Sequence, residues 1–218
     1  MAEDELIRPE VTRAHATLTS AYPPGEETFA GQIMLRLAGG IWEDTDDLIP
    51  EFQELAEEFE EFFPDEPAVD SHAVPDLIAA VLAEHQRVVT ETSYDAIALY
   101  ALADLLLQRG IVLSWGEGFD SSEATEQAAV LGKIAREQGV SVRGYCYAHA
   151  QDIDRLILTG RLYLGFGVFG PRDDAAAEVI GAEVVEILQA ADLPTEWSGS
   201  ADARIVCEPL LYELEIED

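Results

Sequence analysis

Short β-prone runs alternate with helical patterns from Ile111 onward, and this alternation limits the possible folds more than any other feature of the chain. The first run is Ile111 to Trp115, with the sequence Ile-Val-Leu-Ser-Trp. Further strands are predicted at residues 140–148, 162–169, 204–206 and 210–214, and helices at residues 120–138, 151–158 and 173–191. Such an alternation predicts a sheet with helices packed on it.

The residues before Ile111 carry helical patterns instead. Helices are predicted at residues 10–19, 29–37, 74–89 and 95–108, and Pro or Gly punctuates the gaps between them. His85 falls on an apolar helix face, which is typical of a core histidine and not of a ligand. We therefore expect an α+β protein with an acidic helical region over residues 1–92 and an α/β domain with a mixed sheet over residues 93–218.

The charge balance excludes some partners. Asp and Glu number 44 against 12 Lys and Arg, which gives a formal net charge of −32. Binding to nucleic acid or to an anionic membrane requires clustered basic residues, so both are disfavoured. A basic protein partner is compatible with this charge. Lys133 is the only lysine and asparagine is absent, so part of the acidity reflects codon bias or selection for a hydrated surface.

Several features favour a cytoplasmic protein without a cofactor. The acidic N-terminus lacks the apolar run of a signal peptide, and no apolar stretch approaches the roughly 20 residues of a membrane-spanning helix. Cys146 and Cys207 lie far apart and form no metal-binding spacing, so we expect free thiols. The sequence indicates no bound metal, no cofactor and no particular oligomeric state.

The most acidic stretch, Glu43 to Asp70, contains thirteen acidic residues and no basic one. It includes a helical apolar stripe made of Leu48, Phe52, Leu55, Phe59 and Phe62. The carboxylates expected to face outward are Glu51, Glu54, Glu57, Glu58, Glu61 and, beyond the helix, Asp65. This surface is interpreted either as an ordinary solvated face or as a docking face for a cationic partner, with Phe62 and Phe63 adding affinity.

A second candidate site combines His149 and Asp152 with Glu117. The first two are three residues apart at a strand-to-helix junction, a spacing that puts both on one helix face. With Glu117 or Asp154 they would form an acid–base pair or a metal site. The competing interpretation, which we favour, is that Asp152 caps the helix and His149 hydrogen-bonds to it. Nearby aromatic residues are expected either to line a small-molecule pocket or simply to pack: Trp115, Tyr145, Tyr147, Tyr163 and Trp197.

Residues 144–152 read Gly-Tyr-Cys-Tyr-Ala-His-Ala-Gln-Asp and residues 160–167 read Gly-Arg-Leu-Tyr-Leu-Gly-Phe-Gly. With residues 180–185, 193–199 and 204–206, they resemble the core pattern of an uncharacterised bacterial family, common in actinobacteria and catalogued as a domain of unknown function. The resemblance covers residues 93–215 and implies a fold more than an activity. Where that family carries a cysteine cluster, this chain reads Ser-Trp-Gly-Glu-Gly at residues 114–118.

Two classes of function compete, beside a third possibility that this is a halophilic or GC-biased cytoplasmic protein whose charge has no partner. The first, which we favour, is a non-enzymatic acidic binding protein, such as an immunity protein or inhibitor that neutralises a basic protein partner. The alternative is a small-molecule-binding protein or enzyme with a site at His149, Asp152 and Glu117.

Overall fold

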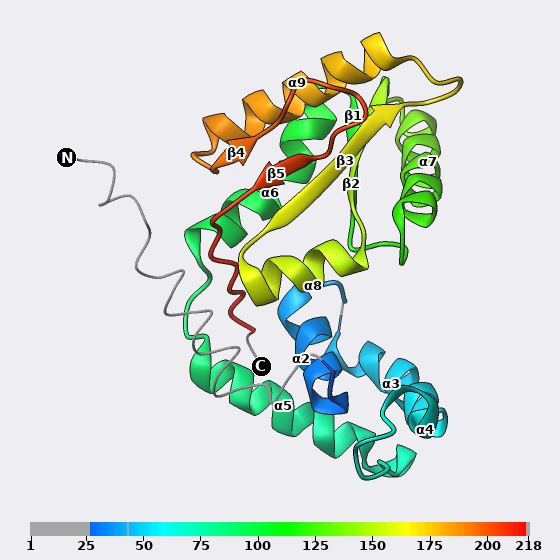
Figure 1. Cartoon of the computed structure of the whole chain (residues 1–218), viewed down its shortest axis with the longest axis vertical. Helices are drawn as coiled ribbons and strands as arrows, with labels where there is room; N and C mark the ends of the chain where they lie inside the picture. The colour runs from blue at the N-terminus through cyan, green and yellow to red at the C-terminus, as the bar shows by residue number, and fades with distance from the viewer. Residues whose placement is uncertain (1–26, 43, 217–218) are drawn as a thin grey trace, which may run out of the picture. The chain divides into compact units, whose positions relative to one another are not determined.

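The computed structural model describes residues 27–42 and 44–216 of the 218-residue chain. These residues form two compact units: a helical unit of residues 27–92 and 213–216, and an α/β unit of residues 93–212 (Figure 1). The predicted α+β class is confirmed. The helix predicted at residues 10–19 lies outside the described residues.

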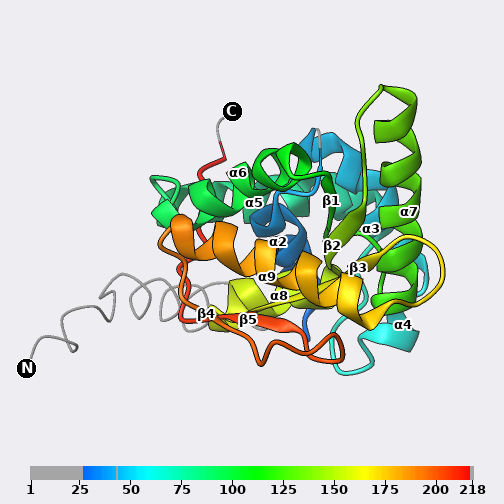
Figure 2. The same cartoon turned by 90° about the horizontal axis from the view of Figure 1, so that it is seen from above.

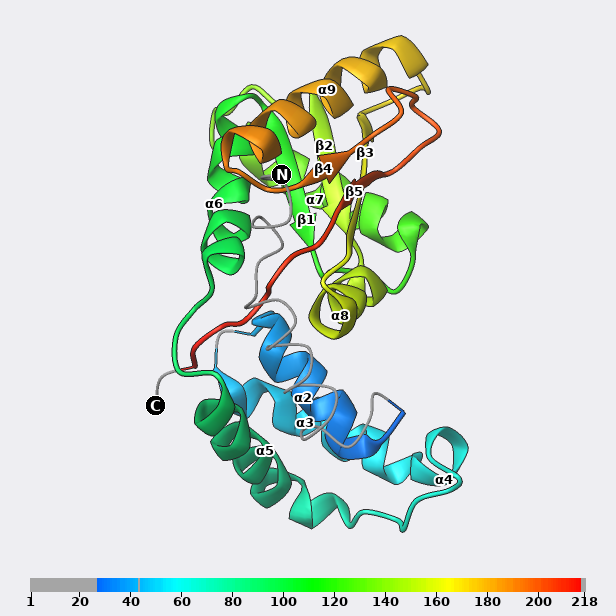
Figure 3. The same ribbon diagram turned by 60° about the vertical axis from the view of Figure 1, so that its left-hand side comes forward.

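The helical unit, whose helices are labelled in Figure 3, is built around a cluster of phenylalanine rings. Its α-helices are α2 (Phe29–Gly39), α3 (Leu48–Glu57), α4 (Phe59–Phe62) and α5 (Val74–Val88), with single 3-10 turns at Thr45–Asp47 and Ser71–Ala73. The ring of Phe29 lies 5.7 Å from that of Phe52, 5.4 Å from that of Phe59 and 5.5 Å from that of Phe63, measured between centroids. Rings at these separations gain electrostatic attraction in addition to burial.

The helical unit also includes the segment from residue 213 to 216. His85 is buried, as expected, and its Nε2–H donates to the carbonyl oxygen of Leu214 at 2.8 Å. The side-chain amide of Gln86 donates to the carbonyl oxygen of Ile216 at 3.0 Å. The prediction of a strand at residues 210–214 is wrong. Leu211 instead donates its N–H to Asp95 and accepts from the hydroxyl of Ser93, at the start of α6.

The α/β unit contains a five-stranded mixed sheet with the strand order β1-β2-β3-β5-β4. The strands are β1 (Ile111–Trp115), β2 (Gly144–Ala148), β3 (Leu162–Val168), β4 (Thr195–Glu196) and β5 (Ile205–Cys207). Strands β1 and β2 run parallel, and the other neighbours run antiparallel. The carboxyl ends of β1 and β2 therefore meet at one edge, where Trp115 is in register with Ala148.

Helices cover both faces of this sheet (Figure 2). They are α6 (Tyr94–Gln108), α7 (Ser121–Glu137), α8 (Ala150–Thr159) and α9 (Asp174–Ala190). Helix α9 packs on one face, where Ile180 contacts the backbone of Gly144 and where α6 lies beside it. Helix α7 packs on the other face, where Gly132 contacts the ring of Phe169. Leu131 is exposed, because the neighbouring Gly132 takes the inward position in this turn of α7.

The ends of these helices follow local rules. Asp120 and Asp173 are the N-caps of α7 and α9, and their side chains accept hydrogen bonds from backbone N–H groups in the first turn. Gly110 and Gly139 follow the ends of α6 and α7 with φ angles of 72° and 86°. A glycine in this left-handed region is a common way to end a helix.

Candidate functional site

The carboxylates predicted to form a docking face do lie on the surface of the helical unit. Those of α3 and the turn after it are Glu51, Glu54, Glu57 and Glu58, followed by Glu61 in α4 and Asp65 beyond it. All six residues are exposed. The opposite side of α3 is apolar, because Leu48 and Phe52 are buried there. The amphipathic pattern of the sequence therefore sets which side chains face water.

The backbone leaves the helical conformation at Glu58 (φ −98°, ψ 15°), between α3 and α4. The residues that face inward after this break therefore no longer follow the spacing of the stripe in α3. Phe62 was expected in the stripe but is 53% exposed. Phe63 takes its place in the core, with its ring 5.2 Å from that of Phe59. The expectation that Phe63 would touch a partner is therefore wrong, and Phe62 is the accessible ring.

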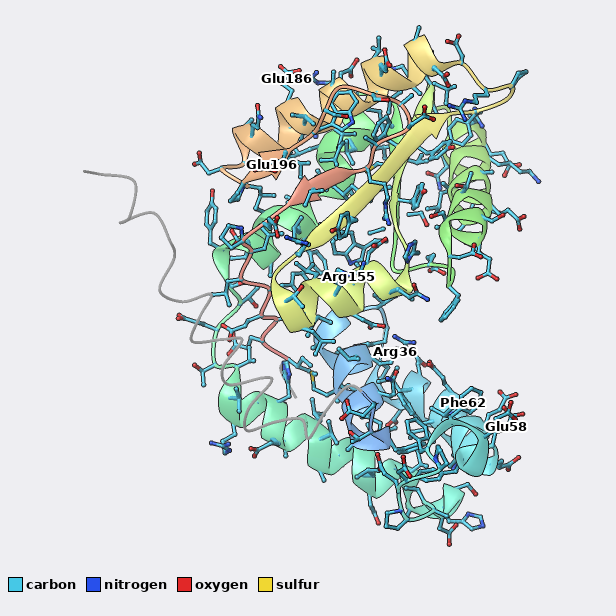
Figure 4. The ribbon with its side chains drawn as sticks, viewed as in Figure 1. Arg36, Glu58, Phe62, Arg155, Glu186 and Glu196 are labelled. Atoms are coloured by element: carbon cyan, nitrogen blue, oxygen red, sulfur yellow. The ribbon has the colours of Figure 1, made fainter. Side chains whose placement is uncertain are left out.

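A groove of about 310 Å³ separates α2 from α3 and α4. It is lined by Gln32 and Arg36 of α2, by Glu51, Phe52, Glu54 and Leu55 of α3, and by Glu58 and Phe62. Within it the Nε of Arg36 donates to Glu51 at 3.2 Å. Figure 4 labels Arg36, Glu58 and Phe62 on these elements. The groove thus combines carboxylates with an exposed aromatic ring and one guanidinium.

The second candidate site lies in the α/β unit and is centred on Asp152, whose side chain is fully buried. Arg204 donates to both of its carboxylate oxygens, with Nη1 at 3.1 Å from Oδ1 and Nη2 in close contact with Oδ2. Arg155 donates to Oδ1 at 3.3 Å. The backbone N–H of His149 donates to Oδ2 at 3.2 Å and thereby caps α8. Asp152 is therefore a hydrogen-bonded buried anion with two arginine partners.

His149 completes this cluster. Its Nε2 lies 3.2 Å from Oδ2 of Asp152, as the favoured interpretation of the spacing required. Burial lowers the pKa of His149 from its ordinary value, and the charges of Arg204 and Arg155 lower it further against the opposing charge of Asp152. Nη1 of Arg204, which can only donate, lies 3.5 Å from the same Nε2, so this ring nitrogen accepts a hydrogen bond from it. Within the described part of the chain, its buried Nδ1 has no hydrogen-bond partner.

Glu117 does not join this cluster. It follows β1 in an exposed loop, at the same edge of the sheet as His149, but none of the hydrogen bonds of His149 or Asp152 reaches it. Asp154 also lies in α8, but two residues after Asp152 and therefore on a different face of the helix, where it is half-buried. Among the described residues, no group of three His, Cys, Asp or Glu side chains is placed to hold a metal ion.

Side chains along β2 point alternately to opposite faces of the sheet, and this separates the side chain of Cys146 from that of His149. The side chain of Cys146 lies in the buried layer, and burial raises the pKa of its thiol to about 12. A nucleophilic cysteine needs a lowered pKa and an adjacent base, so Cys146 acts as a core residue. Cys207 is also buried and free.

The five aromatic residues considered as a pocket do not share one site. Tyr145 and Tyr147 of β2 stack on each other, and Arg204 lies between the rings of Tyr147 and Tyr163. Trp115 instead packs against Tyr212. Trp197 packs edge-on against Phe166, in contact with Gly181 of α9. Of the five, only Tyr147 and Tyr163 contact the cluster, through Arg204.

Sequence reasoning missed the two arginines that determine the electrostatics of the cluster. Arg155 was detectable, because it follows Asp152 by three residues in a helix. Arg204 is 52 residues away from Asp152 and reaches it only through the pairing of β5 with β3. No local spacing signals that contact.

The fold and the two sites define an acidic α+β protein with an acidic groove in its helical unit and a buried Arg–Asp–His cluster in its α/β unit. The chain belongs to the family described as "Domain of unknown function (DUF6891)", whose model matches residues 25–213. The match begins well before the predicted residues 93–215, at residue 25, and includes the acidic helices α2 to α5. No curated protein and no solved structure matches the chain. No helix in the described residues is long and apolar enough to cross a bilayer.

Proposed function

We propose that this protein is an acidic, non-enzymatic cytoplasmic binding protein that holds a basic protein partner on its helical unit, as an immunity protein or an inhibitor does. The observation that carries the proposal is the groove between α2 and α3, where Glu54 and Glu58 lie beside the exposed ring of Phe62. Carboxylates next to an accessible aromatic ring suit a lysine or arginine side chain, because the ring contacts the aliphatic stem and the carboxylates pair with the charged end.

The charge of the whole chain supports the same partner. A formal net charge of −32 attracts a cationic protein over long range and increases the rate of encounter. Specificity would come from the groove itself. Arg36 already neutralises Glu51 there, which leaves Glu54 and Glu58 as the carboxylates for the incoming cation.

The proposal is tested by capture from a lysate of the source cells with three forms of the full chain. The first is the unchanged protein. The second is the double variant Glu54→Gln/Glu58→Gln, and the matched control is Glu178→Gln/Glu196→Gln, which removes two exposed carboxylates from the α/β unit (Figure 4 labels Glu196). A basic protein should bind the unchanged chain and the control at low salt.

The bound protein should be lost from the groove variant. It should also be lost from every form in about 1 M NaCl, where the Debye length falls to about 3 Å. Equal capture by the groove variant and the control would contradict the groove as the binding site. The absence of any basic, salt-sensitive partner would contradict the proposed function.

A further inference from the structure

One face of the sheet in the α/β unit carries a continuous row of aromatic rings and guanidinium groups. In spatial order this ring–guanidinium row consists of Arg136, Phe169, Tyr145, Tyr147, Arg204, Tyr163 and Arg155. The guanidinium carbon of Arg136 lies 4.5 Å from the ring centroid of Phe169. The next ring centroids are 5.4 Å and then 6.3 Å apart. Arg204 follows at 5.6 Å from each of two tyrosine rings, and Arg155 ends the row at 5.3 Å.

Two glycines of β3 allow the rings of β2 to lie flat on the sheet. Gly165 pairs with Tyr147 and Gly167 pairs with Tyr145. A Cβ atom at Gly165 would lie 2.2 Å from Cζ of Tyr147, and one at Gly167 would lie 2.5 Å from the hydroxyl oxygen of Tyr145. The ring planes of the two tyrosines are inclined by 30°, so they present a nearly continuous aromatic platform.

The row is reachable from solvent. The three tyrosines and Phe169 are all half-buried, and the side chains of Arg155 and Arg204 are 43% and 29% exposed. Helix α7, which carries Arg136 at one end of the row, contacts β1 and β2, and α8, which carries Arg155 at the other end, contacts β3. These exposed parts of the rings and guanidinium groups form the surface on which a flat molecule would lie.

The row also has an excess of positive charge in a chain that is otherwise strongly acidic. Arg155 and Arg204 share the single carboxylate of Asp152. Arg136 donates to the carbonyl oxygen of Val142 and makes no ion pair within the described residues. Hydrogen-bonding capacity is also unused here, because the buried Nε of Arg204 and Nδ1 of His149 have no partner in that part of the chain.

We propose that the ring–guanidinium row binds a small anion that carries a planar aromatic ring, such as a mononucleotide. The aromatic ring would stack on Tyr147, and the anionic group would pair with the exposed guanidinium of Arg155. Stacking on a tyrosine and pairing with an arginine are the two interactions by which proteins hold such molecules. This site is independent of the groove in the helical unit and of its proposed partner.

The charge of the chain restricts the ligand to a small one. A polynucleotide brings many phosphates close to a protein with a net charge of −32 and gains few counterion-releasing contacts in return. A mononucleotide brings only one anionic group, and it can place that group at the local excess of positive charge. The ligand class is therefore a free small molecule and not a nucleic acid.

Isothermal titration calorimetry of the full chain with adenosine 5′-monophosphate tests this proposal. We expect saturable binding with a dissociation constant below about 1 mM. Adenosine and inorganic phosphate should each bind at least about fivefold more weakly, because each offers only one of the two interactions. A single-stranded oligoadenylate should not bind more tightly per chain than the monophosphate.

Two pairs of variants assign the binding to the row. Tyr147→Leu removes a ring and should weaken binding by at least about fivefold, whereas Tyr147→Phe keeps the ring and should stay within about twofold. Tyr100→Leu removes an exposed ring from α6 and is the matched control. Arg155→Gln should weaken binding of the monophosphate but not of adenosine, and Arg87→Gln in the helical unit is its control.

Circular dichroism establishes that each variant is folded, and Arg155→Gln replaces Tyr147→Leu as the decisive variant if the latter does not fold. The proposal is overturned if the monophosphate shows no saturable binding. It is also overturned if phosphate alone binds equally well, if the oligoadenylate binds more tightly, or if the row variants bind like their controls. Capture of a partner by the helical unit is measured separately, so the two proposals fail independently.

Discussion

Arg204, which directly precedes β5, donates hydrogen bonds to both carboxylate oxygens of Asp152, in the first turn of α8. Two parallel N–H···O bonds of this kind fix the relative orientation of the two groups. The guanidinium also donates to the carbonyl oxygen of Tyr163 at 2.9 Å, so a single side chain ties α8 to β3. Asp152 has no exposed surface, and its charge depends entirely on these protein partners.

We predict that Asp152→Asn lowers the free energy of unfolding by about 3–5 kcal/mol, which is typical when one member of a buried ion pair is removed. The amide keeps the size of the side chain but not its charge, so Arg204 loses its counterion. Urea titration followed by circular dichroism measures the change. Asp104→Asn, on the exposed side of α6, is the control and should change stability by less than about 0.5 kcal/mol. Equal effects of the two substitutions would contradict the structural role of Asp152.

Gly110 and Gly139 allow a second prediction, because both end a helix with a positive φ angle but differ in surroundings. A Cβ atom at Gly110 would lie 2.6 Å from the carbonyl oxygen of Ser141, whereas one at Gly139 would have no neighbour within 4 Å. Gly139→Ala should cost about 1–2 kcal/mol from the left-handed backbone alone. Gly110→Ala should cost a further 1–3 kcal/mol, roughly, because a backbone atom has to move. Equal midpoints in urea for the two variants would refute this distinction.

The pH dependence of stability should depend in part on His85. Burial lowers the pKa of His85 below its ordinary value of 6.5, against the opposing effect of its hydrogen bond to Leu214. The unfolded chain therefore takes up this proton before the folded chain does as the pH falls. The stability associated with neutral His85 is fully present above about pH 6.5 and is lost as the pH falls below it.

The variant His85→Gln keeps a donor for the carbonyl oxygen but does not titrate. Between about pH 7.5 and pH 5.5, the unchanged chain should lose more stability than this variant, by up to about 1.4 kcal/mol per pH unit. Burial also lowers the pKa of His149, but that group is present in both forms and cancels in the difference. Parallel stability curves for the two forms would show that His85 does not contribute.

Both thiols should be unreactive in the folded protein. Burial raises the pKa of Cys146 to about 12 and that of Cys207 to about 11. Since the thiolate is the reactive form, a disulfide reagent at about pH 8 should modify neither residue until the chain is unfolded. Both cysteines of the chain should then react in denaturant. Rapid modification of one thiol under native conditions would show that the α/β unit opens locally.

The alternation of strands and helices was readable from sequence because each element obeys its own periodicity. The capping aspartates and the glycines after α6 and α7 are signals of the same local kind. The run Leu210 to Leu214 was misread because it has the apolar, β-prone composition of a strand. Its polar backbone groups are satisfied instead by Ser93, Asp95 and His85, which are distant in sequence.

The candidate sites were predictable from the sequence only where their residues belong to a single helix or strand. The six carboxylates of the acidic face follow from the amphipathic pattern, but the break at Glu58 that exposes Phe62 leaves no clear mark in the sequence. The pairing of His149 with Asp152 was expected from their spacing. Arg204 was not expected, because strand pairing and not helix periodicity brings it there.

The helical unit is interrupted in sequence by the whole α/β unit, since residues 213–216 return to α5. A ribosome therefore makes α2 to α5 first and supplies their last contacts only after the intervening residues 93–212. At roughly 5–20 residues per second, that interval lasts on the order of 6–24 s. During each round of synthesis, the helical unit therefore receives its final contacts only after the chain of the α/β unit has been made.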